Sequence, residues 1–120
     1  MEKYIIEFYR EKDGTEPAKE FIESLEPKML AKVLKIFDLL EINGPQLRMP
    51  YSEYLRDGIF EIRAKHGTDI TRILYFFVIG KRIILSNGFV KKDNKIPRME
   101  IERAIKHKID YERGSDNDKL

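Results

Sequence analysis

The sequence predicts an α+β fold: a small, mostly antiparallel sheet with an N-terminal helical hairpin and a C-terminal helix. Three observations predict it. Apolar residues recur at helical spacing over residues 17–43, three successive strand patterns follow within residues 60–89, and a further helical pattern begins at Pro97. Grouped strands with separate helices indicate one domain over residues 1–113, with the helices on one side of the sheet.

The N-terminal elements follow from local signals. Residues 4–9 are rich in β-branched and aromatic side chains and precede a Lys-Asp-Gly turn, which predicts a first strand. Thr15 is the expected N-cap of a short helix with Pro17 in its first turn. A second helix is expected to begin at Pro27 and to end at Asn43-Gly44-Pro45. The two helices in tandem predict an α-hairpin.

The middle of the chain changes to strand periodicity. Alternation over residues 60–65 predicts a half-buried strand with Glu61, Arg63 and Lys65 on its charged face. Residues 70–79 are almost continuously apolar, which predicts a central strand covered on both faces. A Gly-Lys turn then leads to a strand at residues 83–89, so these three strands form a meander.

The remaining elements complete the order β-α-α-(β)-β-β-β-α. The optional strand is Ser52 to Leu55. The last helix begins at Pro97 and has an apolar stripe that includes Ile101 and Ala104. Residues 114–120 are polar and are expected to form a disordered tail.

Composition excludes several function classes. The chain has no cysteine, and its two isolated histidines offer no metal-ligand spacing, so we expect neither a metal nor another cofactor. No apolar run approaches the roughly 20 residues that span a bilayer, and the charged N-terminus lacks the features of a signal peptide. We therefore expect a cytoplasmic protein that has no membrane partner.

The charge distribution is uneven although the net charge is only +2. Between Ile59 and Lys108 there are 12 Lys and Arg against 5 Asp and Glu, whereas the rest of the chain has 11 against 16. A basic second half favours one positive face, which is typical of a polyanion binder. The alternative is chance clustering on a heavily charged surface.

Basic residues are the candidates for chemistry. In an antiparallel meander, Arg63, Arg72 and the strand end at Lys91 and Lys92 lie at the same end of the sheet. Converging cations repel each other unless an anion neutralises them, and a phosphodiester is the obvious anion. The alternative is that each cation pairs with a local carboxylate. The carboxylates in question are Glu61, Asp69 and Asp93.

Such a cluster suits RNA cleavage without a metal, in which the ribose 2′-OH attacks its own 3′-phosphate. Arginines stabilise the added negative charge but do not exchange protons, so a lysine of the cluster or His66 is the candidate for proton transfer. Phe89 and Tyr75 are candidates for stacking on RNA bases, with a place in the core as the alternative.

Four segments carry a family resemblance. They are Leu55-x-x-Gly-Ile-x-Glu-Ile-Arg63, Thr71-Arg-Ile-Leu-Tyr-Phe76, Ile83 to Lys92 with its Gly-Phe-Val-Lys-Lys end, and Ile96-Pro97 followed by Glu100-Ile101. In this order and spacing, the chain resembles the HigB-type, phage Gp49-like branch of the RelE/ParE toxin superfamily. The resemblance covers about residues 4 to 110.

The resemblance implies a RelE-like fold and a ribosome-dependent endoribonuclease that cuts translated mRNA. It also implies a helix-turn-helix antitoxin of the HigA type, which neutralises the toxin and carries the complex to operator DNA. By motif match, the basic active-site positions fall on Arg63, Arg72, Lys91 and Lys92. Many superfamily members have a Tyr or His near the C-terminus for proton transfer, and here Tyr111 or His107 lies roughly there.

Two other functions stay open. A degenerate toxin retained as a non-catalytic module that binds nucleic acid or antitoxin has the same features. Some relatives of this fold inhibit DNA gyrase, and a fold alone does not determine the activity.

Overall fold

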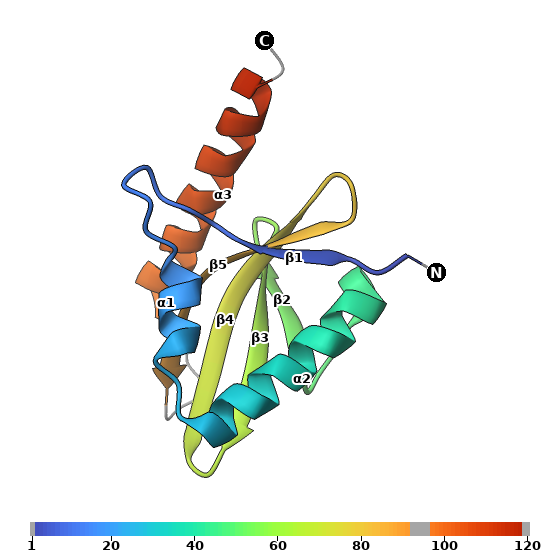
Figure 1. Cartoon of the computed structure of the whole chain (residues 1–120), viewed down its shortest axis with the longest axis vertical. Coiled ribbons are helices and arrows are strands. Elements are labelled where there is room, and N and C mark those ends of the chain that lie inside the picture. The colour runs from blue at the N-terminus through green and yellow to red at the C-terminus, as the bar shows by residue number, and fades with distance from the viewer. Residues whose placement is uncertain (1, 92–96, 119–120) are drawn as a thin grey trace.

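The structure, a computed structural model, describes residues 2–91 and 97–118. Its elements in chain order are β1 (Ile5–Phe8), α1 (Pro17–Glu23), α2 (Pro27–Asn43), the 3₁₀ helix η1 (Gly44–Gln46), β2 (Ser52–Arg56), β3 (Ile59–His66), β4 (Asp69–Val78), β5 (Arg82–Lys91) and α3 (Arg98–Asp118). Figure 1 shows their arrangement. The predicted α+β class and element order are confirmed, including the optional strand as β2.

The five strands form one sheet in the order β1-β5-β4-β3-β2. Strands β2 to β5 are an antiparallel meander, whereas β1 pairs parallel with β5. The α-hairpin connects β1 at one edge of the sheet to β2 at the other edge, so β1 pairs with the last strand, β5, and not with the strand that follows it in the chain. Strand β4 is central, as its continuous apolar sequence predicted.

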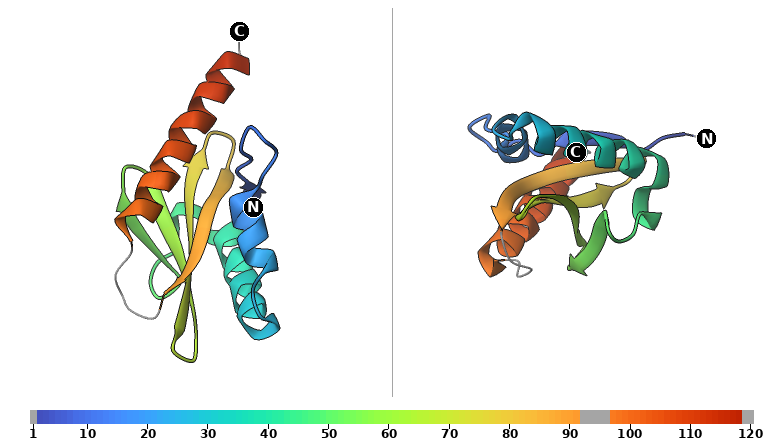
Figure 2. Two further views of the ribbon diagram at one scale, coloured as in Figure 1. Left: turned by 90° about the vertical axis from the view of Figure 1, so that its left-hand side faces the viewer. Right: turned by 90° about the horizontal axis from the view of Figure 1, so that it is seen from below.

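Helices cover both faces of the sheet. The α1–α2 hairpin lies on one face and α3 crosses the other, as the view from below in Figure 2 shows. The expectation of helices on one side is therefore wrong. The reason is β4 itself: Ile73 and Tyr75 join the core under the hairpin, whereas Leu74 and Phe76 join a second core that includes Ala104 of α3. A strand that is apolar on both sides needs cover on both.

Three local predictions have different outcomes. The Gly80-Lys81 turn is confirmed, since both residues have the positive φ values (+93° and +56°) of a hairpin turn. Thr15 does not cap α1; the N-cap is Glu16, and the Thr15 N–H donates to Asp13 Oδ1 at 2.9 Å. The backbone of α3 continues to Asp118, whereas the sequence placed a polar tail from residue 114.

Within the described ranges, none of the helices combines the length and the apolar character needed to cross a membrane.

A β-bulge divides β5 into two halves. Leu74 of β4 lies opposite Asn87, but its neighbour Tyr75 lies opposite Leu85, so Ser86 is an extra residue. An extra residue reverses which side chains face which side of a sheet. Before the bulge, Ile83 and Leu85 face the hairpin; after it, Phe89 faces α3. The bulge therefore moves the odd-numbered residues of the strand end to the α3 face.

Gly88 follows this bulge and lies under α1. A Cβ built at Gly88 would be only 2.4 Å from Cδ2 of the Phe21 ring. The absence of a side chain is what lets α1 approach β5 so closely.

We expect Gly88→Ala to lower the free energy of unfolding by about 1–3 kcal/mol, because the added methyl group forces Phe21 out of its position. Chemical denaturation measures this. Gly114→Ala is the matched control, since no atom lies within 4 Å of its built Cβ, and it should leave stability unchanged or slightly higher. Equal effects of the two substitutions would contradict the packing explanation.

Candidate active site

Strand pairing brings the predicted arginines together. Arg63 of β3 lies directly opposite Arg72 of β4, and Arg72 lies opposite Phe89 of β5. Lys91 is opposite Ile70, two residues nearer the same end of the sheet. We call Arg63, Arg72, Phe89 and Lys91 the arginine row. The register places the row at one end of the sheet, as the sequence predicted, and on the α3 face. Lys92 lies outside the described residues.

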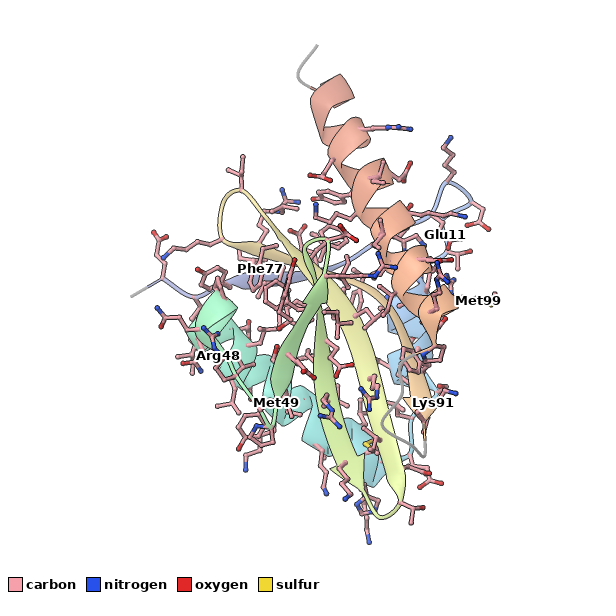
Figure 3. All side chains as sticks on the ribbon, turned by 180° about the vertical axis from the view of Figure 1, so that it is seen from behind. Glu11, Arg48, Met49, Phe77, Lys91 and Met99 are labelled. Atoms are coloured by element: carbon pink, nitrogen blue, oxygen red, sulfur yellow. The ribbon has the colours of Figure 1, made fainter. Side chains whose placement is uncertain are left out.

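Part of this face is not covered by a helix. In Figure 3, the strands between the labelled residues Met49 and Lys91 are seen directly, and α3 crosses the sheet on the Met99 side. The side chain of Arg63 is 20% exposed, whereas that of Arg72 is only 2% exposed. Arg63 is therefore the more accessible of the two arginines, and Arg72 lies beside it on the neighbouring strand.

The anion that neutralises the arginines is within the protein. Nη1 of Arg72 donates to both carboxylate oxygens of Glu61 at 2.9 Å, and Nε of Arg63 lies 3.6 Å from Oε1 of the same group. Glu61 is fully buried. The idea that the converging cations need an external phosphodiester is therefore wrong, and the alternative of a local carboxylate is correct for the two arginines. The charged face of β3 is thus partly buried, at Glu61.

Sheet geometry explains why Glu61 reaches both arginines. Glu61 precedes Arg63 by two residues, so the two side chains lie on the same face of β3. Glu61 is opposite Leu74, which makes Arg72 its diagonal neighbour across the strands. Long side chains on a diagonal meet. Sequence reasoning named Glu61 only as a counter-ion; its spacing from Arg63 was the available signal for a place within the site.

Burial also changes the acid–base character of Glu61. Burial raises the pKa of its carboxyl group, and this effect outweighs the hydrogen bond from Arg72 and the charges of Arg72 and Arg63, which lower it. A carboxylate with a raised pKa accepts a proton more readily than an exposed one. The site therefore combines two guanidinium groups with one buried carboxyl group whose pKa is raised.

Phe89 is half-buried and packs against the apolar cluster beneath α3. Its register position beside Arg72 places it within the row, so stacking on a base stays a prediction. Tyr75 is a core residue: it is 1% exposed, its hydroxyl is bonded to Ser52, and burial raises its pKa to about 12. The core alternative is therefore correct for Tyr75.

The predicted proton-transfer residues lie elsewhere. His66 follows Arg63 by three residues, which places it on the hairpin face, where it lines a hollow with Phe21 and Glu26. The Tyr111 hydroxyl accepts a hydrogen bond from Arg82 at the start of β5, the end opposite Lys91. The structure brings neither residue to the arginine row, because strand alternation separates His66 and helix direction separates Tyr111.

His107 is a structural residue of α3. It is 7% exposed, its ring stacks on Tyr9 at 4.1 Å, and Nδ1 is bonded to the bulge hydroxyl of Ser86 at 2.7 Å. Burial, followed by the charge of Arg103, lowers its pKa, while Glu11 partly opposes this. His107 therefore fixes α3 to the bulge as a neutral imidazole and is not part of the arginine row.

Metal binding has no support in the part of the chain that the structure describes, because no three His, Asp or Glu side chains gather there closely enough to hold an ion.

The chain matches one known family. The family model described as "Phage derived protein Gp49-like" matches residues 20–108. The chain belongs to this Gp49-like family. It is a family of RelE-like toxins, and the match includes Glu61 and the whole arginine row but excludes β1 and Tyr111. No curated protein matches the Gp49-like chain.

We expect Glu61→Ala to lower the free energy of unfolding by about 3–5 kcal/mol, because it removes the carboxylate from a buried guanidinium. Replacing both partners, with Glu61→Leu and Arg72→Leu, should recover most of that loss. Urea denaturation of the three chains measures the effect. A loss below about 1 kcal/mol for Glu61→Ala, the value of a surface pair, would show that the pair is not a structural requirement.

Stability should fall as pH decreases through about 6.5, the ordinary pKa of histidine. Below this value the unfolded chain binds a proton at His107 that the folded chain, with its lowered pKa, does not bind. Melting temperatures between about pH 7.5 and pH 6 test this. His107→Gln should flatten the dependence, whereas His66→Gln, at the other histidine, should not. A dependence that follows His66 would contradict the assignment.

Proposed function

We propose that this Gp49-like chain is the HigB-type toxin of a type II toxin–antitoxin pair and cleaves translated mRNA on the ribosome without a metal ion. The observation that carries the proposal is the arginine row beside the uncovered part of the sheet face, with Arg63 facing solvent and Lys91 at the strand end. Two neighbouring guanidinium groups suit a phosphate that gains negative charge during the reaction.

The proposed reaction needs only RNA. The ribose 2′-oxygen attacks the adjacent phosphorus, the bond from phosphorus to the 5′-oxygen breaks, and the products have a 2′,3′-cyclic phosphate and a 5′-hydroxyl. One proton leaves the 2′-hydroxyl and another joins the 5′-oxygen. The protein therefore has to supply a proton acceptor, a proton donor and positive charge.

Each described group has a proposed role. Arg63 contacts the phosphate from the solvent side, and Arg72 adds positive charge from the neighbouring strand. Glu61 is fully buried, so its proposed role is to orient the two guanidinium groups and not to touch the RNA. Lys91, a half-exposed cation at the end of β5, is the proposed proton donor.

The proposed partners follow from the toxin assignment. They are a helix-turn-helix antitoxin of the HigA type, operator DNA through the complex with that antitoxin, and mRNA on ribosomes in the cytoplasm. The basic second half of the chain supports an RNA partner.

A second candidate is a non-catalytic module that binds the antitoxin or nucleic acid. Two observations favour it: Glu61 neutralises charge at the arginines, and His66 and Tyr111 lie away from them. This module would bind a helix-turn-helix partner and leave ribosome-bound mRNA intact.

Cleavage by purified protein on translating ribosomes, read by primer extension, tests the proposal. Arg63→Ala should slow cleavage by about a hundredfold, because it removes a group that stabilises transition-state charge, and Lys91→Ala should also slow it. Arg63 is preferred to Arg72 because Arg72→Ala also leaves Glu61 buried without its bidentate partner. Both variants should relieve growth arrest upon induction in bacteria.

The control is Lys28→Ala, an exposed lysine of α2, which should cleave like the parent chain. Intact mRNA with every chain would overturn the proposal in favour of the non-catalytic module. Altered DNA supercoiling without message cleavage would instead indicate a gyrase inhibitor.

A further inference from the structure

A second group of basic side chains lines a pocket next to the arginine row. A pocket of about 370 Å³ lies between α2, the chain before β2, and the second half of β3. Its cationic lining residues are Lys32, Lys35, Arg63 and Lys65. None of the described residues that line it is acidic. We call this the edge pocket; Met49, labelled in Figure 3, marks its position.

The wall of the edge pocket is apolar and aromatic. Tyr51 and Met49 are 41% and 54% exposed, although both are large apolar side chains. Leu39 and Ile70 complete the wall. A pocket with an apolar wall and cations suits a ligand that has a flat apolar part and a negative charge. A nucleotide has both, because every base has a face that stacks and every linkage has a phosphate.

Arg63 joins the edge pocket to the arginine row. Its Nη1 lies 3.7 Å from Sδ of Met49, on the pocket side, while its Nε faces Glu61 at 3.6 Å. One guanidinium therefore borders both sites. Two sites that share one guanidinium suit neighbouring phosphates of the same RNA strand.

An acidic peptide is the competing ligand, and the edge of β3 argues against it. A peptide that adds to a sheet needs the free carbonyl and N–H groups of the edge strand. Here the Lys65 carbonyl accepts a hydrogen bond from Lys32 Nζ at 2.6 Å, and the Arg63 N–H donates to the Tyr51 carbonyl at 2.9 Å. Side-chain cations, and not an open strand edge, face the ligand.

We infer that the edge pocket binds a nucleotide of single-stranded RNA next to the one held at the arginine row. The base lies against Tyr51, and the phosphate lies among Lys35 and Lys65. This inference rests on the proposed function, since it takes RNA as the ligand of the row.

Fluorescence anisotropy with a short, labelled 2′-O-methyl oligoribonucleotide, which cannot be cleaved, tests the inference over a range of salt concentrations. The double variant Lys35→Ala with Lys65→Ala should bind more weakly, and its salt slope should be shallower by about 0.7, the contribution of one neutralised phosphate of a single strand. Both lysines are exposed, so the variant should fold. Tyr51→Ala should weaken binding about tenfold with the slope unchanged.

The matched control is Lys12→Ala with Lys28→Ala, which removes the same charge from exposed positions outside the pocket and should keep the parent's slope. Equal slopes for the two double variants would overturn the inference. Displacement of the oligonucleotide by a poly-glutamate peptide, together with no effect of Tyr51→Ala, would also overturn it and indicate an acidic-peptide site.

Binding and cleavage are measured separately, so the two proposals can fail separately. If binding depends on the edge pocket while ribosome-bound mRNA stays intact, the proposed endonuclease activity is wrong and the nucleotide pocket stands. If mRNA is cut but the edge-pocket variants bind and cut like the parent chain, the nucleotide pocket is wrong and the endonuclease activity stands.

Discussion

The buried ion pair of Arg72 and Glu61 is the interaction on which the site depends. The β3–β4 register sets Arg63 directly opposite Arg72, and like charges in that position destabilise a sheet. Glu61 offsets the repulsion by reaching both guanidinium groups from the diagonal position. Because Arg72 and Glu61 are almost fully buried, each needs the other. The geometry of the site is therefore also a condition for the stability of the sheet.

The two sheet faces serve different purposes. The hairpin face has the larger apolar core and holds α1 and α2 against the sheet. The α3 face is divided between a smaller core and the arginine row. His107 connects α3 to the arginine row indirectly. It bonds α3 to Ser86 at the bulge, and the bulge turns the side chain of Phe89 toward α3. The position of α3 and the presence of Phe89 in the arginine row therefore both depend on Ser86 of β5.

The proposed chemistry depends on a difference in exposure within one cluster. Arg63 reaches solvent and the edge pocket, whereas the neighbouring side chains of Arg72 and Glu61 are buried. Buried charged groups act in a low local dielectric, where their electrostatic effects exceed those at the surface. A phosphate at Arg63 would therefore be influenced by charges that water does not screen. In the proposed function, the same three side chains on two strands form both a structural ion pair and the reactive site.

The sequence by itself determined the element order, the central place of β4 and the meeting of the two arginines, because hydrophobic periodicity and hairpin register are local properties. Tertiary structure alone decided three matters. Helices cover both faces of the sheet because β4 is apolar on both. Glu61 is buried because it pairs with its diagonal neighbour Arg72. Phe89 shares a face with Arg72 because of the bulge at Ser86. Simple alternation from Ile83 would have placed Phe89 under the hairpin. A bulge depends on contacts such as that between Ser86 and His107, which are 21 residues apart in the sequence, so local pattern does not reveal it.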